Sequence, residues 1–212
     1  MPQPDLSAYD NSWYSPGKSR LIRALWLFVG QPLLKFELLP LSSIRRFILR
    51  SFGAKVDRSV VLRSGIRVKY PWHLSIGDHS WVGESVWIDN LVEVRIGANV
   101  CISQSAHLCT GNHDWSDPLF GLWVQPIAVE DGSWIGTCAL ICPGVTIGRS
   151  GIAAAGSVVT KSIPPFEIHA GNPAHFVKRR TFREGMRESS GHFAEGYSRN
   201  GQAELTPAQR RW

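Results

Sequence analysis

Charge, paired cysteines and long apolar runs are all scarce in this sequence. Only 19% of its 212 residues are charged, and none of its four cysteines belongs to a Cys-x-x-Cys pair. The cysteines fall between residues 101 and 142, where we expect them to act as small apolar side chains in a reducing compartment. The longest uncharged apolar run, residues 24–34, is shorter than the roughly 20 residues that a bilayer span needs.

Several motifs that define an activity are also missing. There is no Walker A loop and no G-x-S-x-G elbow, which argues against P-loop nucleotide hydrolysis and against the serine hydrolases built on that elbow. The formal net charge is +6, but its basic residues are scattered, so a nucleic acid is a poor partner and an anionic ligand or membrane surface a better one. Residues 1–19 lack the apolar core of a signal peptide, so we expect a cytoplasmic protein, at most peripheral to the inner membrane.

What the sequence does contain is a six-residue period. From residue 129 to 164, each block of six opens with an apolar residue, and its fifth place is small or apolar. This period matches neither a helix nor a simple strand, and it is typical of a parallel β-helix with three short strands per turn. The block-opening side chain then points inward and the fifth lies near a corner. The block-opening residues are Val129, Ile135, Ile141, Ile147, Ala153 and Val159.

The same period organises most of the chain. It holds over residues 76–88 and 96–108, with two extra residues between these stretches, and it is lost between His113 and Ile127. We therefore predict an all-β domain of about five turns over residues 52–178. Residues 114–126 form a loop outside the coil, long enough to be functional. Residues 179–212 are expected to form a basic and polar tail.

The first 51 residues are expected to form an irregular arm followed by helices. The pattern predicts a helix over residues 20–30, a bent piece to residue 39, and a helix over 41–51 with Ser42 or Ser43 as its N-cap. These helices either cap the open end of the coil or act as an amphipathic element on a membrane surface, and the two roles are compatible.

Three tryptophans suggest an oligomer. Trp81, Trp87 and Trp134 all occupy the sixth place of their blocks, where side chains point outward. Exposed aromatic residues on one face usually mark an interface. The simplest assembly for a triangular coil is a trimer.

His113 is the candidate catalytic base. It closes a block where the loop leaves the coil, and a histidine can accept protons near neutral pH. Asp114, or another carboxylate or carbonyl nearby, would orient its ring. The alternative is a surface histidine in a polar turn. His107 lies one block earlier at the same phase, which raises a metal site as a rival. A hexapeptide carbonic anhydrase, however, needs two zinc-binding histidines separated by four residues; these are separated by five, so we expect no metal.

The second half of the repeat has the composition of a groove for a long anionic ligand. Small residues at Gly136 and at positions 153–156 leave little side-chain bulk, and basic residues follow near the end of the repeat. With a base and no nucleophile, direct acyl transfer is the economical chemistry, with a backbone N–H near Gly136 or Thr137 stabilising the oxyanion. The alternative is that the small residues only fit the corners and that the basic run is a solvated tail.

The motifs GVTIG, AAGSVVTK and AGNPA, with the loop sequence CTGNHDWSDP, resemble those of hexapeptide-repeat acyltransferases with a left-handed β-helix. The similarity covers about residues 20–180 and is greatest to the sugar O-acetyltransferases of the colanic acid biosynthesis type. It implies a left-handed coil, a homotrimer with active sites between subunits, acetyl-CoA as the donor, and a sugar or lipid-linked saccharide as the acceptor in surface polysaccharide biosynthesis.

The resemblance also implies roles for single residues. The family's base falls on His113. Ser85 stands where galactoside-type relatives have an acceptor-binding Asn, so the acceptor contacts are expected to fall on Asp89 and Asn90 as well as on Ser85 and Asp114. The positions that would contact CoA are Thr137, Ala155, Thr160, Lys161 and Lys178. Two other hypotheses remain at this point: a carbonic-anhydrase-like metalloenzyme, and a β-helix scaffold without catalytic activity.

Overall fold

The computed structural model describes residues 3–36 and 41–182. Its contacts divide the chain into Met1–Arg180 and Thr181–Trp212. Only Thr181 and Phe182 of the second unit are described, so most of the predicted tail lies outside the described residues. The first unit holds the arm, the helices and the coil together.

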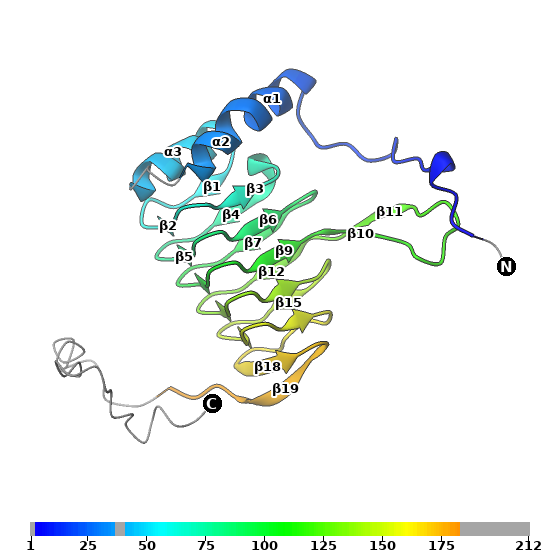
Figure 1. Cartoon of the computed structure of the whole chain (residues 1–212). Helices are drawn as coiled ribbons and strands as arrows, with labels where there is room; N and C mark the ends of the chain where they lie inside the picture. Colours follow the sequence, from blue (N-terminus) through cyan, green and yellow to red (C-terminus); the bar gives the residue numbers. More distant parts are fainter. Residues whose placement is uncertain (1–2, 37–40, 183–212) are drawn as a thin grey trace, which may run out of the picture. The chain divides into compact units, whose positions relative to one another are not determined.

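The coil has three faces, each a sheet of short parallel strands stacked along its axis (Figure 1). Sheet 1 comprises β1 (Lys55–Val56), β4 (Leu74–Ile76), β7 (Val94–Ile96), β12 (Ile127–Val129) and β15 (Thr146–Ile147). Sheet 2 comprises β2 (Val61–Leu62), β5 (Trp81–Val82), β8 (Cys101–Ile102), β13 (Trp134–Ile135), β16 (Ile152–Ala153), β18 (Glu167–Gly171) and β19 (Ala174–Arg179). Sheet 3 comprises β3 (Arg67–Val68), β6 (Trp87–Asp89), β9 (His107–Cys109), β14 (Leu140–Ile141) and β17 (Val158–Val159). The coil thus completes five turns and begins a sixth with β18.

The structure confirms the inward positions that the six-residue period predicts. All six block-opening residues from Val129 to Val159 are at most 2% exposed, and they fill the interior. The fifth places are buried too. Of the two serines among them, Ser133 donates its hydroxyl to the Gly148 carbonyl at 2.9 Å, whereas the Ser157 hydroxyl is buried without a hydrogen-bond partner. Each coil donates backbone hydrogen bonds to the next, so within the three sheets every strand except those at the two ends is paired on both sides.

The corner between sheet 3 and sheet 1, here called the loop corner, is the one that varies. The first turn is as regular as the later ones, with Val56, Leu62 and Val68 six apart, although its sequence looks ragged. Extra residues enter at the loop corner in three successive turns: at Pro71–His73, at residues 90–93, and at residues 110–126. The last of these insertions carries His113.

The N-terminal helices cover the first turn of the coil (Figure 1). They are α1 (Arg20–Leu25), a π-helical turn η2 (Trp26–Gly30), α2 (Gln31–Lys35) and α3 (Ser42–Ser51). The predicted N-cap of α3 is wrong, because Leu41 occupies that position and the Ser42 hydroxyl instead bonds Leu62 N at 2.8 Å. No helix in the described part of the chain has both the length and the hydrophobicity of a bilayer-spanning segment.

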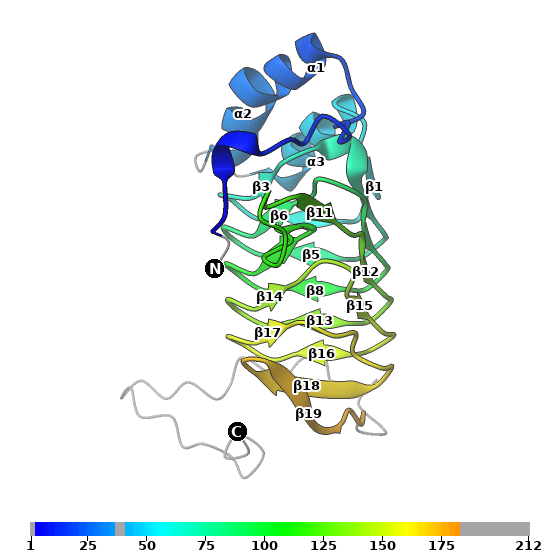
Figure 2. The same ribbon diagram turned by 90° about the vertical axis from the view of Figure 1, so that its right-hand side faces the viewer.

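The stack ends in an antiparallel pairing of β18 with β19 (Figure 2). One further expectation needs correction, because the three tryptophans do not share a face: Trp81 and Trp134 project from sheet 2, whereas Trp87 projects from sheet 3. The sixth place of a block alternates between sheets, so an equal place in the block does not mean an equal face.

Candidate active site

His113 ends β10 (Gly111–His113), which leaves the coil and pairs antiparallel with β11 (Leu122–Val124). Its ring stacks on Phe120, with centroids 4.4 Å apart and planes 10° apart, and its Nδ1 lies 2.9 Å from the Phe120 carbonyl oxygen. A carbonyl only accepts hydrogen bonds, so Nδ1 must carry the proton and Nε2 keeps its lone pair. This is the tautomer that a general base requires.

The loop that supplies this carbonyl is held by its own side chains. Asp117 accepts hydrogen bonds from Leu119 N at 2.9 Å and from Gly121 N at 3.2 Å. The Asp114 carboxylate accepts from the Ser116 hydroxyl at 2.6 Å and from Ser116 N at 2.9 Å, and these bonds lower its pKa. Asp114 therefore shapes the loop, and the Phe120 carbonyl orients the His113 ring.

His113 borders a cavity of about 440 Å³ at the loop corner. Its charged lining is Lys69 and Asp89, whose Nζ and Oδ1 atoms are 3.1 Å apart. A carboxylate beside an ammonium group offers both an acceptor and donors to a polyhydroxylated ligand. The cavity thus combines a proton acceptor with polar groups that could orient a hydroxyl.

Part of this cavity comes from the N-terminal arm, which sequence reasoning did not connect to the site. Tyr9, Asn11 and Tyr14 line it, and the Tyr9 ring lies 5.7 Å from that of His113. The Tyr14 hydroxyl donates to the Leu91 carbonyl at 2.6 Å, and burial raises its pKa. The arm lies outside the six-residue repeat, so the period carries no information about where it folds.

The other predicted acceptor residues are not all available. Asn90 is 0% exposed; its Oδ1 accepts from Tyr70 N at 3.0 Å and its Nδ2 donates to Tyr70 O at 2.7 Å. Asn90 therefore ties two insertions of the loop corner together and presents no group to a ligand. Ser85 is exposed, but it lies at the corner between sheets 2 and 3, across sheet 3 from His113.

The predicted CoA-contacting residues fall into groups within one chain. Thr137 and Ala155 lie in successive turns of the corner between sheets 2 and 3, here called the donor corner, where Gly156 N donates to Thr137 O at 2.8 Å. Thr160 and Lys161 follow β17 at the loop corner, and Lys178 lies on β19. The Gly136 N–H already donates to Ala153 O at 2.8 Å, so of the two backbone donors considered for the oxyanion, Thr137 remains.

His107 does not pair with His113. It stacks on Trp87, with centroids 4.2 Å apart and planes 2° apart, and burial lowers its pKa. Among the described residues, ligand atoms of Asp89, His107 and Cys109 lie within 4.8 Å of one another, but the Lys69 ammonium already neutralises Asp89. This cluster excludes His113, so it offers no support for a metal-bound catalytic water at the base.

A left-handed coil of hexapeptide turns, with a histidine held at the base of an ejected loop, defines the class of hexapeptide-repeat acyltransferases. No known protein-family profile matches the chain. The Escherichia coli (strain K12) protein named as colanic acid biosynthesis acetyltransferase WcaF is 37% identical over 180 residues, covering 85% of this chain and 99% of that protein. The galactoside O-acetyltransferase of E. coli is 29% identical over 143 residues, covering 66% of this chain and 70% of that enzyme.

The fold comparison agrees. The hexapeptide-repeat acetyltransferase VCA0836 of Vibrio cholerae, solved in complex with acetyl-CoA, superposes with a TM-score of 0.68 at 28% identity, covering 78% of this chain and 92% of that one. The chain belongs to the hexapeptide-repeat acetyltransferase family. The carbonic-anhydrase-like and non-catalytic alternatives are thereby set aside.

Proposed function

We propose that this acetyltransferase transfers the acetyl group of acetyl-CoA to a sugar hydroxyl during the synthesis of a surface polysaccharide. The observation that carries the proposal is the fixed tautomer of His113 at the edge of a cavity with a polar lining. The names of the relatives, a colanic acid acetyltransferase and a galactoside O-acetyltransferase, support a sugar as the acceptor.

In the proposed reaction, Nε2 of His113 removes the proton from the acceptor hydroxyl. The oxygen attacks the thioester carbonyl, and a backbone N–H at Thr137 stabilises the oxyanion. The tetrahedral intermediate collapses and expels the CoA thiolate, which takes the proton from the imidazolium. Asp89 and Lys69 orient the acceptor, while Ala155, Thr160, Lys161 and Lys178 contact CoA.

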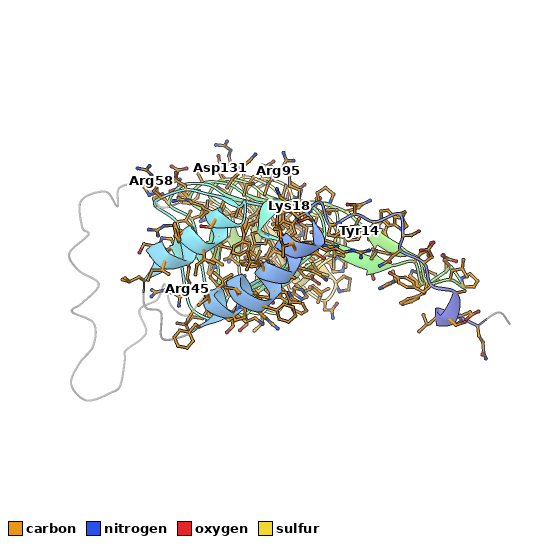
Figure 3. All side chains as sticks on the ribbon, turned by 90° about the horizontal axis from the view of Figure 1, so that it is seen from above. Tyr14, Lys18, Arg45, Arg58, Arg95 and Asp131 are labelled. Carbon is orange, nitrogen blue, oxygen red and sulfur yellow. The ribbon has the colours of Figure 1, made fainter. Side chains whose placement is uncertain are left out.

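The same proposal includes a homotrimer with sites between subunits. His113 at the loop corner and Thr137 at the donor corner lie on opposite edges of sheet 3 in one chain, so a neighbouring chain is needed to bring such groups together. Sheet 2 carries the exposed Trp81, whereas charged residues such as Arg58, Arg95 and Asp131 gather on another side of the coil (Figure 3). This contrast favours sheet 2 over sheet 1 as a face buried between subunits.

We further propose that the enzyme works in the cytoplasm, at the membrane surface, on a saccharide carried by a lipid. The cysteines support a reducing compartment, since Cys101, Cys109, Cys138 and Cys142 are all unpaired. The N-terminal helices are the part that would contact the membrane.

The test is a thiol-release assay with acetyl-CoA and a panel of sugar acceptors. His113→Ala should reduce kcat by about 10²–10⁴-fold, the usual contribution of a general base, and leave the Kd of acetyl-CoA nearly unchanged. Leu119→Ala is the matched control: it truncates an exposed side chain of the same loop that lines neither cavity at His113, and it keeps the bond from Leu119 N to Asp117. Near-normal turnover by His113→Ala would contradict the mechanism, and no thiol release with any sugar would contradict the acceptor class.

A further inference from the structure

The helical segment formed by α1, η2 and α2 is apolar on both of its faces. Trp26, Gly30 and Leu34 recur every four residues and are buried, and the Trp26 indole donates to Val68 O at 3.1 Å. A helix on a protein surface normally carries polar residues along its outward face, whereas between residues 24 and 34 every exposed residue of this segment is apolar. The exposed large apolar residues of the segment and its end are Leu21, Ile22, Leu25, Leu27, Phe28, Val29, Leu33 and Phe36.

The outward side chains are well exposed rather than partly covered. Leu21 is 79% exposed and Phe28 75%, and Phe47 on α3 adds a ring that is 69% exposed. Contiguous apolar surface of this kind marks a site of contact with a protein or a membrane.

The charges around this surface have one sign. Residues 11–36 contain no Asp or Glu, and their four charged residues, Lys18, Arg20, Arg23 and Lys35, are all basic. In Figure 3, which looks down on this end of the molecule, Lys18 lies beside the start of the helical segment. A second copy of the same surface would bring like charges together, whereas anionic lipid headgroups would complement them.

We propose that this apolar and basic face, here called the helical face, docks on the surface of an anionic lipid bilayer. Residues 20–35 span about 24 Å as a helix, less than the hydrocarbon thickness of about 30 Å, so the segment lies in the interface plane rather than across it. Leu21, Leu25 and Phe28 enter the boundary between headgroups and acyl chains, and Lys18, Arg20 and Lys35 contact the phosphates.

Docking in this way bears on the acceptor. From Ser19, the cap of α1, the chain runs back through Tyr14 to Tyr9, and both tyrosines line the cavity that His113 borders. The arm thus joins the helical face to the cavity directly. If the acceptor is a lipid-linked saccharide, a step that rests on the proposed function, the same bilayer holds both enzyme and acceptor.

The test is co-sedimentation of the full chain with vesicles. Vesicles of phosphatidylglycerol and phosphatidylethanolamine should bind the protein, and vesicles of phosphatidylcholine alone should bind it at least tenfold more weakly. Leu21→Ser with Phe28→Ser should reduce binding at least tenfold. Lys18→Gln, Arg20→Gln and Lys35→Gln together should reduce it by roughly a hundredfold, since each basic residue near such a surface contributes about a factor of five.

The matched control is Phe176→Ser with Val177→Ser, which removes two exposed apolar residues from β19 at the other end of the coil and should leave binding unchanged. Equal binding to both vesicle types, or full binding by the Leu21→Ser, Phe28→Ser variant, would overturn the proposal. So would concentration-dependent self-association in place of vesicle binding. Acetyl transfer to a free saccharide, measured on the same proteins, tests the proposed function separately.

Discussion

Residues near the loop corner divide into those that face a ligand and those that hold the corner together. Asp89 and Asn90 are neighbours in sequence, yet Asp89 lines the cavity, whereas the side-chain amide of Asn90 is hydrogen-bonded to the backbone of Tyr70. Strand alternation explains the difference, because successive side chains point to opposite sides of a strand. The two residues therefore make separable predictions.

Asp89→Asn should raise the KM for the acceptor by roughly tenfold, because one charge-assisted hydrogen bond is worth about 1.5–3 kcal/mol and the amide retains part of it. The KM for acetyl-CoA should not change. Steady-state kinetics with each substrate varied in turn provide the measurement. Asp114→Asn is the control in the loop, since its carboxylate is occupied by Ser116. A rise in the donor KM alone would remove Asp89 from the acceptor site.

Asn90→Ala should instead destabilise the protein. It leaves the Tyr70 N–H and C=O groups without their partner in a buried place, at about 1–3 kcal/mol for each unsatisfied group. A lower urea midpoint with both KM values near normal is the expected result. Ser85→Ala, an exposed change earlier in the same turn of the coil, should move the midpoint little. A changed acceptor KM at normal stability would restore Asn90 to the site.

At the scale of elements, the coil and the N-terminal helices follow from the sequence, whereas the contacts made by the insertions and by the arm do not. A side chain such as Ile135 or Ile141 points inward because every turn repeats the same geometry, so a local period predicts a global position. The Asn90–Tyr70 bonds, the Phe120 carbonyl and the placement of Tyr9 depend on segments brought together from outside the period. His113 could be found because it marks the break in the repeat. A nearby carboxylate or carbonyl is expected to orient its ring, but the Phe120 carbonyl could not be singled out, because a main-chain carbonyl has no sequence signature.

The close stacking of coils gives a prediction about glycines. A Cβ at Gly136 would lie 2.5 Å from Ala155 N in the next turn, a contact that the backbone cannot relieve without moving a coil. Gly136→Ala should therefore cost about 1–3 kcal/mol, as overpacking does. Gly156 meets nothing within 4 Å, so Gly156→Ala should cost only the penalty of its left-handed φ of +69°, about 1–2 kcal/mol.

Thermal unfolding would compare these two variants, and the stacking argument further requires that Gly136→Ala weaken acetyl-CoA binding more than Gly156→Ala. The reason is that Gly136 precedes Thr137 in one turn and packs against Ala155 in the next. Pushing these two turns apart would therefore distort the donor corner. Equal stability and equal acetyl-CoA affinity in the two variants would contradict it.

The arm offers a second prediction at this scale. It is anchored by Asp5 N, which donates to Pro118 O at 2.8 Å, and by Tyr14 through Leu91. Deleting residues 1–12 removes Tyr9 and Asn11 from the cavity but leaves Tyr14 and the helices. The acceptor KM should rise several-fold while the KM for acetyl-CoA stays constant. An unchanged acceptor KM would show that the arm covers the loop without contributing to recognition.

At the scale of the whole molecule, the separation of the two corners is the main constraint. His113 projects from the loop corner, whereas Thr137 and Ala155 lie at the donor corner on the far edge of sheet 3. A base and a thioester must come within bonding distance of one acceptor oxygen. One chain cannot satisfy this with the residues assigned, but a cyclic trimer satisfies it three times if the loop corner of one subunit meets the donor corner of the next.

This arrangement predicts complementation between inactive variants. His113→Ala removes the base, and Ala155→Arg fills the donor corner with a long side chain at an exposed position, so each homotrimer should be inactive. In trimers assembled from both variants in equal amounts, a site is intact when its base comes from an Ala155→Arg chain and its donor corner from a His113→Ala chain. Random assembly gives about one quarter of the sites, and thus about one quarter of wild-type thiol release. Mixing after separate folding should restore nothing until the subunits exchange. Activity that stays at background in co-expressed mixed trimers, verified by mass, would mean that the base and the donor groups lie on one chain. The proposal that Thr137 and Ala155 form the CoA side of the site would then be wrong.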